Sequence, residues 1–357
     1  MKYFSAFSGI GGFEYGIQSS YREKNGGSQT VKKIGDSQRH KKSKGTNAKR
    51  RRPSKHCDNG RYKEPACIGY SEVDKYAIQI YQKHYPLHKN YGDITKIKTL
   101  PDFDLFVGGF PCQSFSIAGK RRGFTDTRGT LFFDIARICK QKQPRLLLLE
   151  NVKGLLSHDK GNTFATILKT LDEIGYDVQW QVLNSKDFGV PQNRERVFIV
   201  GHLRGTRRPK VFPIIQGSQS HLEYCGGVIS AREKWLKDGK NNSRNFSQGQ
   251  RIYSKEGTSQ TLAGNAGGQG GKTGLYQVGP TLTARCDDRG FFQKQLMRQT
   301  NLIRRLTPTE CERLQGFPDG WTEGMSDTQR YKCLGNAVTT NVITAVVEKL
   351  LIKKGIN

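Results

Sequence analysis

The sequence lacks any long hydrophobic run, although 34% of its 357 residues are hydrophobic. No stretch approaches the roughly 18 apolar residues that a membrane span needs, and the first residues lack the apolar core and cleavage site of a signal peptide. The eight cysteines include no Cys-x-x-Cys pair. His56, Cys57 and Cys67 fit no structural zinc spacing, so no metal is expected. We therefore expect a cytoplasmic protein with reduced thiols.

Acidic residues are scarce relative to basic ones. The chain has 59 Lys and Arg against 31 Asp and Glu, a net charge of +28. Such an excess indicates a polyanionic partner, with nucleic acid first and an anionic membrane surface second. No amphipathic basic helix stands out, which disfavours the membrane.

The glycine turn near the amino terminus lacks the pattern of the common nucleotide sites. Residues 7–12 read Phe-Ser-Gly-Ile-Gly-Gly, which is neither Gly-x-Gly-x-x-Gly nor a P-loop with its lysine, so neither NAD nor ATP is indicated. The turn could instead cradle a ligand through backbone amides at a helix start. Glu72 ends the next expected strand, where an acid commonly accepts hydrogen bonds from ribose hydroxyls. With Asp93, at the expected end of a third strand, these residues favour a nucleoside-containing cofactor.

Apolar strands alternate with helices along most of the chain. Strands are expected at 2–7, 67–72, 103–107, 145–150, 177–183 and 196–201, and helices from 13 onward and at 74–84, 163–174, 309–315 and 338–353. Asp74 is a plausible N-cap for the second helix. Alternation of this kind predicts an α/β fold with a parallel sheet covered on both faces.

Two regions depart from this pattern and define the expected domains. Residues 204–303 are rich in Gly, Ser, Asn and Gln and predict a smaller, loop-rich domain. It separates a catalytic and cofactor-binding domain at 1–203 from a returning segment at 304–357. Residues 21–66 contain 15 Lys and Arg against 4 Asp and Glu, a net charge of +11, a composition typical of a disordered insertion.

Cys112 follows an apolar strand on the turn Gly108-Gly109-Phe110-Pro111. Ligands and chemistry collect at the carboxyl ends of strands in α/β sheets, so the thiol is placed as a nucleophile, although an isolated cysteine is more often a small buried hydrophobe. Glu150 ends the neighbouring apolar strand and could act as an acid beside that thiol. Arg194 and Arg196 add guanidinium groups that can hold a carbonyl or a phosphate.

These motifs together resemble the DNA (cytosine-5-)-methyltransferases of bacteria and phages, which use S-adenosyl-L-methionine. The matching blocks occur in the family's order and span nearly the whole chain: Phe7-Ser8-Gly9-Ile10-Gly11-Gly12-Phe13, Gly109-Phe110-Pro111-Cys112-Gln113-Ser114-Phe115-Ser116, Glu150-Asn151-Val152, Gln192-Asn193-Arg194-Glu195-Arg196, the block from Arg305 to Pro318, and Gly335-Asn336-Ala337-Val338. The resemblance implies a Rossmann-like, mostly parallel methyltransferase sheet and a target recognition domain at 204–303. The basic insertion departs from the family, which usually joins these elements more briefly.

The resemblance also implies a mechanism. Cys112 adds to C6 of a cytosine, Glu150 holds or protonates N3, Arg196 grips O2 and Arg194 supports it. Because a base inside a duplex is unreachable, the target cytosine must be flipped out.

Further contacts are carried over from the family by position. The cofactor contacts are Phe7, Gly9, Gly11, Glu72, Val73, Asp93, Pro111, Leu131, Asn336 and Val338, with Val73 against the adenine ring. The DNA contacts are Ser116, Arg128, Thr261 and Leu262. A second Thr-Leu pair, Thr281-Leu282, leaves open which pair belongs to the recognition loop.

Two alternative functions stay open at this stage. A tRNA cytosine-5 methyltransferase of the same fold usually has a Pro-Pro-Cys block and a reduced recognition region. A non-catalytic DNA-binding relative would not need Cys112, Glu150 and Arg196. We expect a monomer acting on double-stranded DNA. The recognised bases, and whether a separate restriction endonuclease accompanies the enzyme, cannot be read from the sequence.

Overall fold

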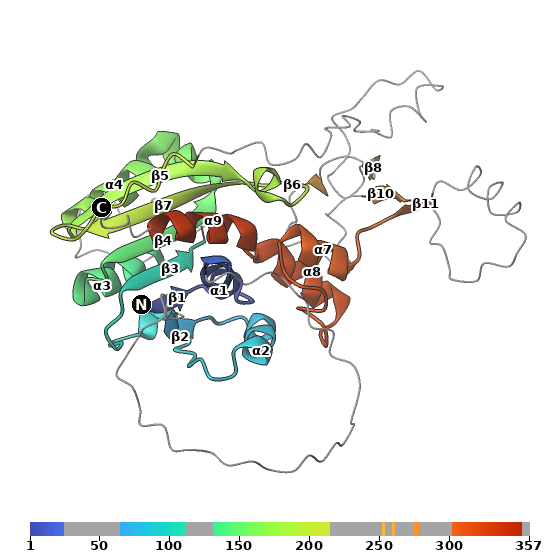
Figure 1. Ribbon diagram of the computed structural model, residues 1–357, viewed down its shortest axis with the longest axis horizontal. Coiled ribbons are helices and arrows are strands. Elements are labelled where there is room, and N and C mark those ends of the chain that lie inside the picture. The colour runs from blue at the N-terminus through green and yellow to red at the C-terminus, as the bar shows by residue number, and fades with distance from the viewer. Residues whose placement is uncertain are drawn as a thin grey trace, which may run out of the picture.

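The computed structural model describes residues 1–24, 65–111, 131–214 and 302–351, together with three short strands between 252 and 278. Six strands form the main sheet: β1 (Lys2–Ala6), β2 (Ala66–Ser71), β3 (Leu105–Gly109), β4 (Leu146–Val152), β5 (Tyr176–Asn184) and β7 (Glu195–Leu203). Their order is β2-β1-β3-β4-β7-β5 (Figure 1). β1 pairs in parallel with β2 and β3, and β3 with β4. β7 is antiparallel to β4 and β5. The expected mostly parallel sheet is confirmed, with β7 as its exception.

Helices precede and follow these strands in the expected alternation. They are α1 (Gly12–Lys24), α2 (Lys75–His84), α3 (Leu131–Lys142), α4 (Asn162–Glu173), α7 (Pro308–Leu314), α8 (Asp327–Asn336) and α9 (Thr340–Leu350), with 3-10 turns η1 (Ile94–Lys96), η4 (Lys153–Leu156), η5 (His158–Gly161) and η6 (Ser185–Phe188). Two small sheets join β6 (Gln192–Asn193) to β9 (Ser259–Gln260), and β10 (Leu275–Val278) to β8 (Ile252–Tyr253) and β11 (Leu302–Arg304).

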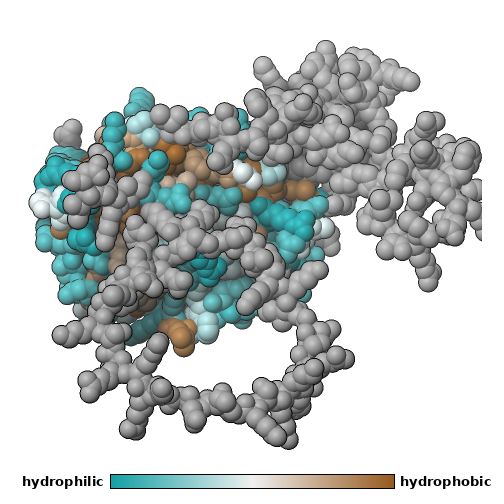
Figure 2. All heavy atoms as spheres, in the orientation of Figure 1, coloured by the Kyte–Doolittle hydropathy of each residue, from teal (hydrophilic) through white to brown (hydrophobic). Residues whose placement is uncertain are grey.

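Alternate side chains of the central strands fill two cores. In β4, Leu147 and Leu149 pack in a cluster with α3 and α4, whereas Leu146 and Leu148 pack with α1 and α9 on the other face. This two-sided burial explains the uninterrupted apolar sequence of the strand. A third cluster joins α2, α7 and α8 beside the sheet. Figure 2 shows a mainly hydrophilic surface in this orientation, with hydrophobic side chains gathered in its upper part, where β5 lies in Figure 1.

Helices α1 and α9 come from opposite ends of the chain and lie against each other (Figure 1). A Cβ atom at Gly16 would lie 2.6 Å from Cβ of Ile343 and 2.9 Å from the carbonyl oxygen of Thr340. Only glycine permits this approach. The hydroxyl of Thr344 also donates to the carbonyl of Gly16 at 3.1 Å. The returning segment is therefore an integral part of the sheet's cover.

Two expectations about individual elements need correction. Helix α1 continues to Lys24, with Tyr21 buried, so the first residues of the basic tract are helical. No regular strand precedes Asp93; a single bridge from Tyr70 to Asn90 stands in its place. Helices α3 and α8 were not anticipated. None of the helices in the described ranges is long and apolar enough to span a membrane.

Candidate active site

The turn between β1 and α1 leaves open space beside its backbone. Phe7 and Gly9 have φ angles of 52° and 56°, and a Cβ atom at Gly9 would meet no heavy atom within 4 Å. The buried hydroxyl of Ser8 has no hydrogen-bond partner among the described residues. A left-handed glycine, free space and an unsatisfied hydroxyl suit a turn that approaches a bound ligand closely.

Glu72 joins the end of β2 to this turn. Its carboxylate accepts hydrogen bonds from the backbone N–H groups of Gly9 at 2.8 Å, Val73 at 2.8 Å and Asp74 at 2.9 Å. The side chain of Val73 is 69% exposed and offers an apolar surface beside the carboxylate. The structure thus brings together three residues that the sequence predicted around a nucleoside, Gly9, Glu72 and Val73.

Asp93 reaches the same edge without a strand of its own. The hydroxyl of Ser71, at the end of β2, donates to the carbonyl of Gly92 at 2.6 Å. Asp93 caps η1 by accepting from the backbone N–H of Thr95 at 3.0 Å and from its hydroxyl at 2.8 Å. These hydrogen bonds hold the pKa of the Asp93 carboxyl below its ordinary value.

The ends of β3 and β4 place Glu150 next to the turn that leads to Cys112. Gly109 is the register partner of Glu150, and a Cβ atom at Gly109 would lie 3.1 Å from Oε2 of that acid. The amide of Asn151 donates to the carbonyl of Phe110 at 2.9 Å. Pro111, which directly precedes Cys112, is the last residue of this described range.

Glu150 forms an ion pair with Arg196. Nε of Arg196 lies 3.1 Å from Oε1 of Glu150, and both side chains are largely buried. The antiparallel pairing of β4 with β7 creates this contact, because Val152 lies opposite Arg196 in the register. Burial lowers the pKa of Arg196, and the neighbouring Glu150 carboxylate acts in the opposite direction. The pair presents an acceptor and a cation side by side at the strand ends.

Arg194 contacts the end of α8. Its Nη2 donates to the carbonyl of Ala337 at 2.8 Å and to that of Gly335 at 3.3 Å. Burial, together with the cation of Arg196 and against the opposing effect of the Glu150 carboxylate, lowers the pKa of Arg194 to about 9. Arg194 therefore ties the start of β7 to the motif that holds Asn336.

The remaining described cofactor candidates are Val338, Asn336, Gly11 and Leu131. Val338 is buried between the turn and β3, since Cβ atoms at Gly12 and Gly109 would lie 2.7 Å and 3.8 Å from its methyl groups. Asn336 is exposed at the end of α8. Gly11 lies in the turn itself, with a φ of 90°. Leu131 begins α3 and packs against the larger core.

Five predicted residues lie outside the described ranges, as does the pair Thr281-Leu282. They are Cys112, Ser116, Arg128, Thr261 and Leu262. Residues 25–64 of the basic tract lie outside them as well.

Asn151 is a site residue to which sequence reasoning gave no role. It is 2% exposed, and its amide spans from β4 to the carbonyl of Phe110, two residues before Cys112. Its place directly after Glu150, in the family block Glu150-Asn151-Val152, could have indicated that it belongs to the site. Within the described ranges no group of His, Cys, Asp or Glu could hold a metal ion, and Cys67, Cys139, Cys311 and Cys333 are free thiols.

The glycine turn after β1, Glu72 after β2 and the Glu150–Arg196 pair at the end of β4 lie at one edge of a mostly parallel sheet. This arrangement is that of an α/β methyltransferase. Among solved structures, the Dnmt2 methyltransferase of S. pombe superposes with a TM-score of 0.61 at 18% identity, covering 98% of each chain. That likeness supports the fold.

Comparison of sequences gives the family. Residues 1–352 match the family of C-5 cytosine-specific DNA methylases, and the chain belongs to it. It is 43% identical over 299 residues to the Type II methyltransferase M1.ScrFI of Lactococcus lactis subsp. cremoris, covering 79% of this chain and 71% of that protein. It is 36% identical over 301 residues to the Type II methyltransferase M.HhaI of Haemophilus parahaemolyticus, covering 78% and 85%. The chain is a DNA cytosine-5-methyltransferase that uses S-adenosyl-L-methionine.

Proposed function

We propose that this enzyme methylates C5 of a flipped-out cytosine within a specific short sequence of double-stranded DNA, through a covalent bond between Cys112 and C6. The observation that carries the proposal is the pairing of Glu150 with Arg196 beside the turn that leads to Cys112. N3 and O2 are neighbouring atoms on the edge of a cytosine ring. A carboxyl group and a guanidinium 3.1 Å apart match that edge.

In this mechanism the Cys112 thiolate adds to C6, and the displaced ring electrons make C5 nucleophilic. Glu150 binds N3 and the exocyclic amine, and Arg196 binds O2, which drains charge from the ring during the addition. When bound, S-adenosyl-L-methionine supplies an electrophilic methyl group for C5. Loss of the C5 proton to solvent then breaks the S–C6 bond and returns the thiolate. Arg194 supports Arg196 and fixes the end of α8.

The residues at the glycine turn fit the cofactor. A nucleoside with two ribose hydroxyls suits the Glu72 carboxylate, and the exposed Val73 suits an adenine ring. The open space at Gly9 and the unpartnered hydroxyl of Ser8 leave room and hydrogen-bonding capacity for the remainder. We assign the other cofactor contacts to Phe7, Gly11, Asp93, Pro111, Leu131, Asn336 and Val338.

We further propose that residues 204–303 recognise the target, with 1–203 and 304–357 forming the catalytic domain. The pairing of β9 with β6 supports this division, because it joins residues just before Thr261-Leu262 to the strand just before Arg194. Thr261, Leu262, Ser116 and Arg128 then contact DNA. We propose a cytoplasmic monomer. Relatives named Type II methyltransferases favour a role beside a restriction endonuclease, and an orphan methyltransferase of Bacillus phage rho11s marks the solitary alternative.

The covalent intermediate can be trapped directly. A duplex carrying 5-fluorocytosine at the target should remain bonded to the wild-type enzyme, because fluorine cannot leave C5 as a proton. Cys112→Ser should form no adduct and transfer no methyl group, since a hydroxyl is a far weaker nucleophile than a thiolate. Cys67→Ser, in a half-buried thiol of β2, is the matched control and should retain both properties. Methylation by Cys112→Ser would refute the assignment, and bisulfite sequencing of host DNA would report the target.

A further inference from the structure

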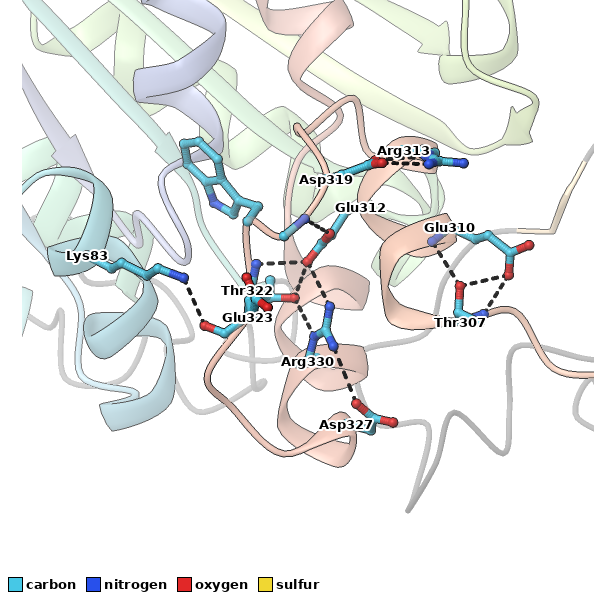
Figure 3. A network of polar contacts seen from close by, with 12 residues as sticks. Lys83, Thr307, Glu310, Glu312, Arg313, Asp319, Thr322, Glu323, Asp327 and Arg330 are labelled. Carbon is cyan, nitrogen blue, oxygen red and sulfur yellow. Dashed lines mark hydrogen bonds and ion pairs between the residues drawn. The ribbon is translucent and has the colours of Figure 1, made fainter. Parts of the chain in front are cut away.

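The mechanism gives no role to the sequence block from Arg305 to Pro318, although it is among the longest family blocks in the chain. This block forms α7 and leads into a loop, residues 315–326, which we call the Trp321 loop. Figure 3 shows the polar contacts that surround it. We infer that the Trp321 loop positions the glycine turn for cofactor binding, with Trp321 as the positioning residue. The inference rests on the cofactor pocket proposed above.

Glu312 fixes the backbone on both sides of Trp321. Its carboxylate is fully buried on α7 and accepts the backbone N–H groups of Gly320 at 2.7 Å and Thr322 at 2.8 Å, as well as the Thr322 hydroxyl (Figure 3). Arg330 of α8 forms an ion pair with this carboxylate, with its Nη2 lying 3.2 Å from Oε1 of Glu312. Nε of Arg330 also donates to the Thr322 hydroxyl at 2.9 Å. A buried carboxylate with four donors is well satisfied, which makes it a rigid anchor.

The indole ring is held as firmly as its backbone. It stacks on His84 of α2, with ring centres 3.6 Å apart and planes within 6°, and on Phe317 at 5.0 Å. Tyr15 of α1 meets it edge-on at 5.2 Å. His84 also contacts the carbonyl of Trp321 through Nε2 at 2.7 Å. The orientation of the indole N–H is therefore set by the surrounding structure.

That N–H donates to the glycine turn. Nε1 of Trp321 lies 3.0 Å from the carbonyl oxygen of Ile10. Ile10 directly follows Gly9, beside which the space is open, and precedes Gly11, which packs against Tyr85. Because a carbonyl and the following N–H share one rigid peptide plane, fixing the Ile10 carbonyl also fixes the N–H of Gly11. Glu72 also holds this turn, by accepting the N–H of Gly9. The turn is thus held by an acid in the amino-terminal part of the chain and by an indole in the returning segment.

Trp321→Phe tests the inference, because it keeps an aromatic ring and removes the donor. Loss of one hydrogen bond should weaken binding of S-adenosyl-L-methionine by about three- to tenfold in a calorimetric titration. The KM for this cofactor should rise accordingly, whereas kcat at saturating cofactor and the KM for DNA stay unchanged. Trp180→Phe is the matched control, since Trp180 is half-exposed on β5 and packs edge-on against Phe164. An unchanged cofactor affinity, or an equal rise in the KM for DNA, would overturn the inference.

A second variant keeps the test independent of the tryptophan itself. Thr322→Val removes the hydroxyl that Glu312 and Arg330 share while preserving the side-chain shape. It should weaken cofactor binding in the wild-type background and have no further effect in the Trp321→Phe background, because both act through the same contact. Additive effects on cofactor affinity would show that the network stabilises the fold without positioning the turn.

Val73→Ala separates the inference from the proposed pocket. The exposed Val73 side chain can be shortened at little cost to folding, so a loss of cofactor affinity would support the pocket alone. If Val73→Ala weakens binding and Trp321→Phe does not, the positioning role fails and the pocket stands. If neither variant changes the affinity, the pocket is wrong, and the positioning role fails with it.

Discussion

The buried Glu14 should make the stability of this protein depend on pH in a way that one substitution removes. Glu14 lies in the first turn of α1, is fully buried, and accepts a hydrogen bond from the hydroxyl of Tyr81 at 3.0 Å. Burial raises the pKa of its carboxyl from 4.5 to about 7, although the Tyr81 hydroxyl opposes the shift. As the pH rises, the unfolded chain releases the proton of this carboxyl near pH 4.5, whereas the folded protein keeps it until about pH 7.

The sign and size of the effect follow from this difference. The stability that the protonated carboxyl contributes is fully present below pH 4.5 and is lost as the pH rises through about 7. A shift of this size corresponds to about 3 kcal/mol in total, of which about 2 kcal/mol falls between about pH 5.5 and about pH 8. Glu14→Gln removes the titrating group and keeps an oxygen that can accept from Tyr81.

Urea unfolding at a series of pH values and constant ionic strength measures the difference directly. Between about pH 5.5 and about pH 8, the free energy of unfolding of the wild type should fall relative to that of Glu14→Gln by about 2 kcal/mol. His88, which also contacts the Tyr81 hydroxyl, has a pKa lowered by burial. It is present in both proteins, so its titration cancels in the difference. Glu323→Gln, at an exposed carboxyl, is the control and should follow the wild type. Parallel curves for Glu14→Gln would refute the reasoning.

Three further predictions concern activity. Glu150→Gln should lower turnover by about 10²- to 10⁴-fold and leave cofactor affinity unchanged in a titration; loss of cofactor binding with normal single-turnover chemistry would move Glu150 to the cofactor site. Exchange of residues 204–303 for another enzyme's recognition domain should change the sequence methylated, as read by bisulfite sequencing; a hybrid that keeps its original target would place specificity elsewhere. Deletion of residues 25–64, which carry a net charge of +10, should preserve kcat and target but flatten the salt dependence of non-specific binding, at roughly 0.9 in log–log slope per lost phosphate contact; an unchanged slope would leave the tract as a passive insertion.

Local sequence signals predicted most of the sheet and its first two turns. Asp74 caps α2 as expected, accepting from the backbone N–H groups of Tyr76 and Ala77. The apolar runs located β1 to β4 within a few residues. Helix α8 escaped prediction because its sequence is mostly polar. Its contacts, including Arg330 to Glu312 and Lys332 to Asp74 at 2.6 Å, join residues far apart in the chain.

The site was predictable as a set of residues but not as an arrangement. Block order along the chain put Glu150 and Arg196 in one site, yet only the antiparallel direction of β7 puts their charges in contact. The nine residues of β7 include apolar and polar side chains, and this pattern does not indicate whether the strand runs parallel or antiparallel to β4. Arg194 shows the same limit, since its buried contact with the carbonyl of Ala337 depends on packing between segments 143 residues apart.

The contact between α1 and α9 has a consequence for how the protein is made. During synthesis α1 emerges early, but Ile343 and Val347, which cover its apolar face, are added more than 300 residues later. At typical elongation rates this interval is on the order of tens of seconds. Until then Phe13 and Ile17 lack the cover that α9 provides, and the glycine turn lacks its contact with Trp321. A nascent chain should therefore depend on chaperones until α9 has emerged, and it should reach its full cofactor affinity only after Trp321 contacts the glycine turn.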